Sequence, residues 1–293
     1  MKIVIAGGRG ALGRRLVAHL AGHEVVVLTR GNPGPGELHW DGMTVGPWAE
    51  QLRGAAVINL AGELVDKRPT ARNVELLRSS RVQPTRALVE AAKHYPVATW
   101  IQASTLAIYS DAGEQRITED TPVPERGLPQ MTGVARAWEA ALDGAVADRI
   151  ALLRTGIVLD RGTPALDRLA LITKVGLGGR IASGRQWISW IHIDDRLHIV
   201  DLALANQLDG IVVASAPNPV RNAELMAALR RALRRPAAPP TPTWLLRAGA
   251  VLMRTDPALA LTGRHGTSTK VTEFHYPTIE SALDELFTAH RRP

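Results

Sequence analysis

The stretch Lys2-Ile-Val-Ile-Ala-Gly-Gly-Arg-Gly-Ala-Leu-Gly13 opens the chain and decides its fold. A short apolar run over residues 2–6 is followed at once by three glycines spaced GxxGxxG. Apolar residues then recur at helical spacing up to Leu20, and Gly22 marks the end of that helix. A second apolar run covers residues 24–29. The order strand, glycine turn, helix and strand predicts a βαβ unit that opens a parallel sheet.

The same alternation continues to residue 154. Apolar runs predict further strands at 38–40, 55–60, 98–103 and 149–154, and apolar spacing predicts helices at 73–95, bent or restarted near Pro84, and at 132–147. Beyond them come glycine-rich loops, a helix at 194–207, a strand at 211–214 and a proline-dense segment at 236–242. We therefore expect an α/β protein with a Rossmann-like doubly wound parallel sheet. The sheet domain covers 1–160, with part of 190–215 returning to it, and a smaller α+β substrate lobe covers 161–293.

Composition excludes several classes of protein. The 293 residues include no cysteine, so disulfides, thiolate metal sites and cysteine nucleophiles are absent. No apolar run is long enough to span a membrane, and the N-terminus lacks the features of a signal peptide, so we expect a cytoplasmic protein. The net charge of +7 includes an arginine cluster at 230–235, but few aromatic residues accompany it, so we expect no nucleic-acid partner. The histidines show no metal-ligand spacing, so we expect no metal.

The glycine loop predicts a dinucleotide site. Gly7 permits a tight turn, Gly10 lets the backbone approach a pyrophosphate, and Gly13 lets the helix pack closely on the strand. Ala11 and Leu12, at the start of the helix, complete the loop, because a helix N-terminus offers amide donors and a favourable dipole to phosphate.

The end of the second strand favours NADP(H) over NAD(H). NAD enzymes of this type usually place an acidic residue there to bind the ribose 2′-hydroxyl. This chain has Arg30 instead, and an arginine suits the 2′-phosphate of NADP. Arg9 in the loop could pair with the same phosphate, although a surface arginine without a ligand would give the same pattern.

Several further motifs resemble one family. They are the glycine loop, Asn59-Leu-Ala-Gly-Glu63, Lys67-Arg68, Ser80-Arg81, Leu153-Arg-Thr-Gly-Ile-Val-Leu159 and Gly184-Arg-Gln-Trp-Ile-Ser-Trp-Ile-His-Ile-Asp-Asp195. Together they resemble the atypical extended short-chain dehydrogenase/reductases. The likeness is to the epimerase-family, nucleoside-diphosphate-sugar epimerase-like subgroup, which carries a small C-terminal domain of unknown function. The resemblance covers nearly the whole chain, and the 184–195 string is its most specific part.

The resemblance implies NADPH as the cofactor and assigns further residues to its site. Arg30 matches the position that binds the 2′-phosphate, and Asp41 matches a position near adenine. The turn after the fourth strand would run along the nicotinamide ribose through Leu60, Ala61 and Gly62. Family members also often dimerise through two long helices, so the resemblance suggests a homodimer.

One departure from the family pattern concerns catalysis. Extended enzymes use Tyr-x-x-x-Lys on the helix after the fifth strand, where tyrosine is the acid/base and lysine lowers its pKa. The corresponding segment here, residues 130–139, contains neither residue, and none of the chain's three tyrosines has a lysine four positions later. This departure puts tyrosine-driven carbonyl reduction and sugar epimerisation in doubt.

Other side chains are candidates for the missing proton donor. Ser104, Thr105 and Tyr109 match the serine-rich end of the fifth strand, and Thr105 stands where the extended enzymes keep an active-site hydroxyl. Tyr109 would instead be a core residue if its hydroxyl only reached the rim. His192 is another candidate, because imidazole is a common acid/base near neutral pH, although with Asp194 it could simply cap the following helix.

A second group of residues is expected to contact substrate. Lys67 lies in the loop after the fourth strand, where it would face either the substrate or solvent. Arg185 and Gln186 precede Trp187 and Trp190, so a guanidinium that grips an anion would stand beside indole rings that wall a flat ligand. The alternative is a hairpin anchored in the core by its tryptophans. Arg221 is a weaker candidate for anion recognition.

These observations lead to one main hypothesis and two alternatives. The main hypothesis is an NADPH-dependent oxidoreductase that acts on a small carbonyl or activated-alkene substrate without the Tyr-x-x-x-Lys pair. The first alternative is an NADPH-binding sensor or interaction protein with little turnover. The second is a non-redox epimerase, lyase or cyclase on the same fold.

Overall fold

A seven-stranded parallel sheet forms the centre of the computed structural model, which describes residues 1–288. The strand order is β11-β7-β5-β4-β1-β2-β3, and every neighbouring pair is parallel. The strands are β1 (Lys2–Ala6), β2 (Glu24–Thr29), β3 (Glu37–His39), β4 (Ala56–Asn59), β5 (Val97–Thr105), β7 (Ala147–Thr155) and β11 (Gly210–Ala214). This order confirms the expected Rossmann-like, doubly wound sheet.

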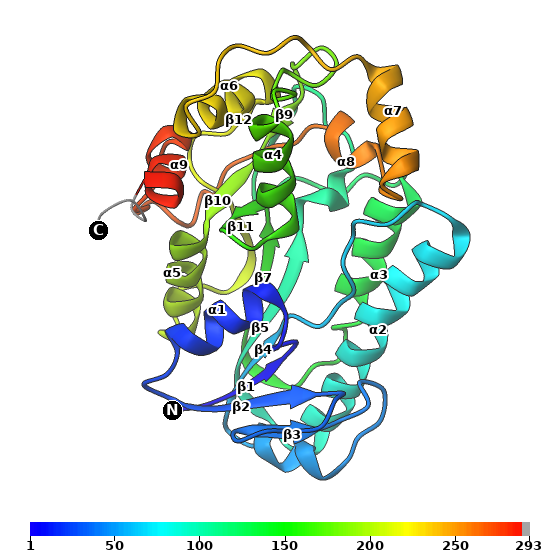
Figure 1. Cartoon of the computed structure of the whole chain (residues 1–293). Helices are drawn as coiled ribbons and strands as arrows, with labels where there is room; N and C mark the ends of the chain where they lie inside the picture. Colours follow the sequence, from blue (N-terminus) through cyan, green and yellow to red (C-terminus); the bar gives the residue numbers. More distant parts are fainter. Residues whose placement is uncertain (289–293) are drawn as a thin grey trace.

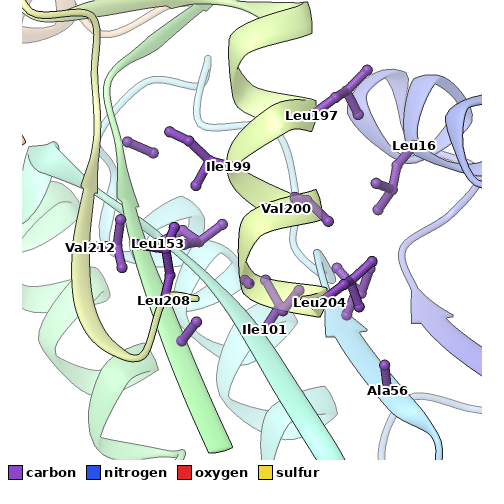
Figure 2. Close-up of a cluster of buried hydrophobic side chains, with 14 of the residues drawn as sticks. Leu16, Ala56, Ile101, Leu153, Leu197, Ile199, Val200, Leu204, Leu208 and Val212 are labelled. Carbon is purple, nitrogen blue, oxygen red and sulfur yellow. The ribbon is translucent and has the colours of Figure 1, made fainter. Parts of the chain in front are cut away.

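Helices cover both faces of the sheet (Figure 1). On one face α1 (Ala11–His19) and α5 (Ile193–Leu204) share a buried apolar cluster with the sheet, and Figure 2 shows Leu197 of α5 near Leu16 of α1. On the other face lie α2 (Ala71–His94), α3 (Val134–Ala140) and the short 3-10 helix η1 (Pro47–Leu52). Each layer buries its apolar side chains against the sheet, which is the main source of stability for such a fold.

Two helices differ from the prediction. α2 runs from Ala71 to His94 without restarting at Pro84, because Pro84 is buried against the protein together with Val82 and Thr85, and Thr70 caps the first turn. α3 is much shorter than the expected 132–147. It follows a single π turn, η3 (Pro129–Gly133), and ends at Ala140 before a turn in which Gly144 has φ +82°.

The remaining elements pack beyond the carboxyl ends of the strands. β8 (Ile157–Leu159) pairs with β10 (Trp190–His192), and β9 (Trp187–Ile188) pairs with β12 (Val220–Arg221). Here α4 (Pro164–Lys174), α6 (Asn222–Ala232) and α9 (Ile279–Thr288) share an apolar cluster of their own. The other short elements are η2 (Leu106–Tyr109), β6 (Arg116–Ile117), α7 (Thr243–Leu252), α8 (Ala258–Leu261) and β13 (His265–Gly266), which pairs with β6.

Candidate functional site

The glycine loop between β1 and α1 makes contacts that only glycine permits. Gly7 has φ +85°, and a Cβ there would lie 2.8 Å from the carbonyl carbon of Leu60. A Cβ at Gly13 would lie 2.3 Å from the carbonyl oxygen of Gly7. At Gly10, by contrast, a Cβ would meet only that same oxygen, at 3.3 Å. Gly7 and Gly13 therefore fix the loop, whereas Gly10 leaves space at the start of α1.

The N-terminus of α1 fits the diphosphate of a dinucleotide. Its N-cap is Gly10, no side chain accepts a hydrogen bond from the first turn, and that turn contains no acidic residue. Ala11 and Leu12, the first two helical residues, are half-buried. Free amide donors, the positive end of the helix dipole and the lack of a Cβ at Gly10 together suit a close-lying anion.

Arg30 and Arg9 lie together at the carboxyl end of β2 but differ in their partners. In the part of the chain that the structure describes, the exposed side chain of Arg30 makes no hydrogen bond or ion pair. The Arg9 guanidinium lies over Gly31, where its Nη1 would be 2.8 Å from an added Cβ. Arg9 Nε donates to Glu37 Oε1 over 2.9 Å, and Nη2 donates to Glu37 Oε2. This hydrogen-bonded pairing lowers the pKa of Glu37 to about 2.

Asp41 shapes the turn after β3. Its Oδ1 accepts the backbone N–H groups of Met43 and Thr44 over 2.7 and 2.8 Å, and its Oδ2 accepts the Thr44 hydroxyl over 2.6 Å. These hydrogen bonds, led by the Thr44 hydroxyl, lower its pKa to about 2. The carboxylate is thus already occupied within the protein, and its expected place near adenine stays a prediction.

The turn after β4 lies directly against the glycine loop. Leu60 donates its N–H to the Ala6 carbonyl over 2.9 Å, and Ala61 donates to Asn59 Oδ1 over 3.1 Å. Arg81, named above only as part of a family motif, is buried and supports the turn, since a Cβ at Gly62 would lie 3.0 Å from Arg81 Cζ. Arg81 Nη2 also donates to the Glu63 carbonyl over 2.8 Å. Burial lowers the pKa of Arg81 to about 10.

The segment where the family keeps its Tyr-x-x-x-Lys pair is packed against the C-terminal part of the chain. Met131 is buried, and its sulfur lies 3.8 Å from Arg264 Nη1. Its neighbour Gln130 donates to Asp256 Oδ2 over 2.9 Å. These contacts hold the segment in place. Neither the Met131 nor the Gln130 side chain can act as an acid/base near neutral pH.

Ser104 and Tyr109 belong to one buried polar network. Ser104 donates its hydroxyl to Glu139 of α3, and Arg154 of β7 makes two hydrogen bonds to the same carboxylate, over 3.0 and 2.8 Å. Arg154 Nη1 donates over 2.7 Å to the Tyr109 hydroxyl, which itself donates to the Thr121 carbonyl over 2.8 Å. Burial raises the pKa of Tyr109. The proton of each hydroxyl is therefore committed inside the protein, which does not favour either residue as an acid for substrate.

Thr105 differs from its neighbours at the end of β5. It is half-buried, and its Oγ1 accepts the N–H of Ala107 over 3.1 Å, which starts η2. The hydroxyl proton of Thr105 has no acceptor among the described residues. Thr105 thus keeps a free donor at the carboxyl end of the sheet.

His192 has the capping role that we considered for it. Its Nδ1 accepts the Asp194 N–H over 3.2 Å at the start of α5, and its Nε2 lies 3.1 Å from Glu285 of α9. The ring is buried and packs on Tyr276. His192 therefore joins α5 to α9, whereas Tyr109 lies in a separate cluster with η2, and the structure does not bring the two side chains together.

The two tryptophans of the 184–195 string anchor it in the protein. Trp190 is fully buried, and its Nε1 donates to the Asn218 carbonyl over 3.1 Å. One face of the Trp187 ring stacks on the His265 ring, with 3.9 Å between the ring centres. The other face lies against the Arg221 guanidinium, whose Cζ is 3.8 Å from the centre of the Trp187 ring. Neither indole has a free face for a flat ligand, so the geometry matches the alternative of a tryptophan-anchored segment.

The polar residues that we expected to contact substrate differ in whether their side chains already have partners in the protein. Arg221 forms an ion pair with Glu114, at 2.7 Å, and Gln186 donates to the carbonyls of Ile181 and Ala260. Arg185 is exposed, and no side-chain partner for its guanidinium exists within the described residues. Lys67 Nζ lies 3.9 Å from Glu63, in a loop that contacts the end of α7. Arg185 and Lys67 thus remain available to an anionic group.

A second buried cation was missed from the sequence. Arg196 of α5 is sealed in the protein, and its Nε and Nη1 have no hydrogen-bond partner. Burial alone lowers its pKa to about 10. Side chains on a helix tilt toward its N-terminus, which for α5 lies at the carboxyl edge of the sheet. The one sequence signal for the burial of Arg196 is its place on the apolar face of the predicted helix. The neighbouring charges of Asp194 and Asp195 made that face hard to recognise.

Residues 1–288 contain neither a cluster of metal-binding side chains nor a helix that could span a membrane. No group of three or more histidine, aspartate or glutamate side chains there could hold a metal ion. No helix there is long and apolar enough to cross a bilayer.

Comparison with known proteins places this arrangement among related chains. The NAD dependent epimerase/dehydratase family matches residues 3–129. The mouse epimerase family protein SDR39U1 is 35% identical over 262 residues, which cover 85% of this chain and 86% of that protein. The epimerase family protein YfhF of Bacillus subtilis is 31% identical and covers 98% of both chains.

Solved structures give the same result for the whole fold. The human epimerase family protein SDR39U1 (isoform 2), solved with NADPH, superposes with a TM-score of 0.85 at 29% identity, over 98% of this chain and 99% of that one. A nucleoside-diphosphate sugar epimerase from Corynebacterium glutamicum superposes with a TM-score of 0.78 at 31% identity, over 99% of this chain and 58% of that one.

Proposed function

Because this chain belongs to the NAD-dependent epimerase/dehydratase family, we propose that it is an NADPH-dependent oxidoreductase of the extended short-chain type. Its substrate would be a small carbonyl compound or activated alkene. The observation that carries the proposal is the glycine loop, in which Gly10 leaves space before an uncapped helix and Arg30 stands without a partner nearby. The NADPH present in the human SDR39U1 structure supports the choice of cofactor.

Each part of the loop has a binding task in this proposal. The first amides of α1, from Ala11 onward, bind the diphosphate, and Gly10 lets it approach. Arg30 binds the 2′-phosphate, and Arg9 assists where it is released from Glu37. The Leu60–Gly62 turn lies along the nicotinamide ribose. When bound, NADPH supplies a hydride to the substrate.

Thr105 is the hydroxyl that we propose for the substrate oxygen. Its Oγ1 is fixed by the Ala107 N–H, so its own proton can point away from the protein. A hydrogen bond from this hydroxyl would orient a carbonyl and stabilise negative charge that develops on its oxygen. Ser104 and Tyr109 would hold the end of β5 in place through Glu139 and Arg154, without touching the substrate.

A second candidate function is a sensor that binds NADPH with little turnover. The committed protons of Ser104, Tyr109 and His192 favour it, because the site then contains no side chain poised to donate a proton near neutral pH. Oxidation of NADPH over a panel of carbonyl compounds separates the two functions. Product formation without net cofactor change would instead identify epimerase, lyase or cyclase chemistry.

The test of the cofactor site is a paired titration of NADPH and NADH, read by tryptophan fluorescence. We expect NADPH to bind at least ~10-fold more tightly, a difference of about 1.4 kcal/mol, and Arg30→Ala to abolish that preference. Arg149→Ala is the matched control, since Arg149 is also exposed but lies near the amino end of β7. Equal binding of the two nucleotides by the wild-type protein would contradict the role of Arg30. Absence of binding by either would refute the whole proposal.

A further inference from the structure

α7 exposes most of its apolar side chains. Of its ten residues only Ala250 is buried, while Trp244, Val251 and Leu252 are 70%, 62% and 85% exposed. A helix on a protein surface normally turns its apolar side chains inward. This helix therefore presents an apolar surface that has no covering element within the described chain.

Two other segments that are linked to α7 also expose large apolar side chains. Large exposed apolar side chains occur in the loop after β4 and along the end of α4, and Asp66 connects these segments to α7. Asp66 accepts the hydroxyl of Thr255, just after α7, and pairs with Arg168 of α4. Of the 15 large apolar side chains that are clearly exposed in the described chain, 10 belong to these three segments. They are Leu64, Val65, Leu171, Val175, Leu177, Trp244, Leu245, Val251, Leu252 and Met253.

Two adjoining hollows lie between α7 and the loop after β4. One, of about 380 Å³, has an apolar lining that includes Pro69, Ala250 and Val251. The other, of about 360 Å³, includes Lys67 and Met253, and both are bordered by Arg68. Both hollows are open to solvent, so they would cover one side of a bound molecule rather than enclose it. Because the hollows share a border, they form one groove, which we call the α7 groove.

The charge around the α7 groove is strongly positive. Lys67, Arg68, Arg247 and Arg254 border it, and the one carboxylate among the bordering residues, Asp66, is paired with Arg168. Lys67 lies 3.9 Å from Glu63, so the excess positive charge comes from the three arginines. Within the described chain, the guanidinium groups of Arg247 and Arg254 have no hydrogen-bond or ion-pair partner. An apolar lining with free cations at its border is complementary to a molecule that joins an apolar chain to an anionic head.

Both walls of the α7 groove are connected to segments of the proposed reaction centre. The loop that forms one wall continues directly from the Leu60–Gly62 turn. The other wall is tied to the segment that replaces the Tyr-x-x-x-Lys pair, since Asp256, four residues after α7, accepts a hydrogen bond from Gln130. Figure 1 shows α7, in orange, on the same side of the molecule as α2 and α3.

We propose that the α7 groove binds an amphiphilic substrate, with its apolar chain along α7 and its anionic head, a phosphate or carboxylate, at Arg247. This assignment rests on the proposed function, because it names the substrate class of that same enzyme. Arg68 holds the groove together by donating to the Val251 carbonyl, whereas Arg247 is free to contact the ligand.

The probe for this proposal is decyl phosphate in its monomeric range, titrated by calorimetry into the full-length protein with and without NADPH. We expect saturable binding at least ~10-fold tighter than that of inorganic phosphate or of the uncharged decyl glucoside. Arg247→Gln and Val251→Ser should each weaken binding about fivefold or more. The matched controls are Arg235→Gln, at an exposed position shortly after α6, and Val146→Ser, at an exposed position before β7, which should leave binding unchanged.

Several outcomes would overturn the proposal. Equal affinity for decyl glucoside would show that the anionic head does not contribute to binding. Undiminished binding of decyl phosphate by either groove variant would show that the ligand binds outside the α7 groove. Binding to anionic phospholipid vesicles without binding of monomeric decyl phosphate would make α7 a membrane-docking helix instead. NADPH titrated into the same samples separates the two proposals. Normal decyl phosphate binding without NADPH binding would refute the oxidoreductase but keep the groove as an amphiphile site.

Discussion

At the residue scale, the carboxylate of Glu37 is paired with Arg9, the arginine that we propose to assist Arg30 in binding the 2′-phosphate. Arg9 donates to both Glu37 oxygens, whereas Arg30 has no partner in the described chain. The lowered pKa of Glu37, about 2, keeps this carboxylate charged at every working pH. If Arg9 assists in binding the 2′-phosphate, as we propose, NADPH has to displace Glu37 from Arg9 and NADH does not.

We expect Glu37→Gln to strengthen NADPH binding by roughly twofold to fivefold, because an exposed charge pair is weak and its loss frees Arg9. NADH affinity should not change. Fluorescence titration of both nucleotides checks this, with Glu24→Gln, an exposed glutamate at the start of β2, as the control. A similar gain for NADH would mean that the substitution acts through the loop rather than through the 2′-phosphate.

The glycines of the loop have separable roles. Gly13→Ala places a Cβ 2.3 Å from a backbone oxygen, so it should lower both the melting temperature and NADPH affinity. The Cβ of Gly10→Ala would meet only the Gly7 carbonyl oxygen, at 3.3 Å, and the φ of −69° suits alanine, so this variant should lower stability much less than Gly13→Ala while it weakens NADPH binding. Gly133→Ala, at an open helical position, should stabilise by about 0.5–1 kcal/mol. Thermal melts with and without NADPH distinguish these cases, and normal cofactor binding by Gly10→Ala would contradict the role of that glycine.

The sequence predicted local residue roles better than distant ones. The spacing of Gly7, Gly10 and Gly13 encodes backbone geometry within a single turn, so it could be interpreted directly. The pairing of His192 with Glu285 joins residues 93 positions apart, and that of Arg154 with Tyr109 joins residues 45 apart. No local pattern marks such pairs, so the commitment of these side chains became visible only in three dimensions.

At the scale of elements, apolar periodicity was sufficient for every strand of the central sheet. It failed for α3, because the π turn at Pro129–Gly133 and the turn after Ala140 preserve an apolar pattern that resembles one longer helix. It also could not separate a substrate-binding segment from a structural one at Trp187 and Trp190, because both uses place large aromatic residues at the same spacing.

The stacked group at β9, β12 and β13 predicts a pH dependence. Burial, assisted by Arg116 and Arg221, lowers the pKa of His265 below its usual 6.5. The folded state therefore binds this proton less readily than the unfolded state, so stability is complete above pH 6.5 and declines as the pH falls below it. Glu114 has a pKa of about 2 and stays charged over this range.

We accordingly expect the melting temperature to drop more between pH 7.5 and 5.5 in the wild-type protein than in His265→Gln, which cannot titrate. The measurement is a thermal melt at each pH, with His23→Gln, an exposed histidine before β2, as the control. An identical drop in wild type and His265→Gln would show that other groups control acid sensitivity.

At the scale of the whole molecule, the chain returns to the sheet domain at residues 267–271, before it forms α9. Val271 packs in the apolar cluster of β1, α1 and α5, and Thr267 donates its N–H to the Ile117 carbonyl over 3.0 Å. Glu119 accepts hydrogen bonds from Ser268, Thr269 and the backbone of β11. The predicted division at residue 160 rests on the loss of strand–helix alternation. That pattern cannot reveal a later segment, such as residues 267–271, that packs against the sheet domain.

The homodimer that the family resemblance suggests stays a prediction. The outward positions of α2, such as Gln83, Arg86 and Glu90, are polar or charged. Interfaces of stable homodimers are usually more apolar than this. A dimer formed through α2 would therefore depend on charge pairs and weaken as salt is added.

The crossing segment predicts that the two parts of the chain unfold together. Opening the C-terminal elements would pull Val271 and the partners of Glu119 out of the sheet domain, so neither part can lose its structure while the other keeps its core. We expect one calorimetric transition with equal calorimetric and van't Hoff enthalpies, and NADPH at ~100 times its dissociation constant should raise the unfolding free energy by about 2.7 kcal/mol. Glu119→Gln keeps the side-chain shape but weakens these hydrogen bonds, so it should lower the melting temperature without splitting the transition. Two resolved transitions in the wild-type protein, with NADPH shifting only one of them, would mean that the C-terminal elements fold as an independent domain.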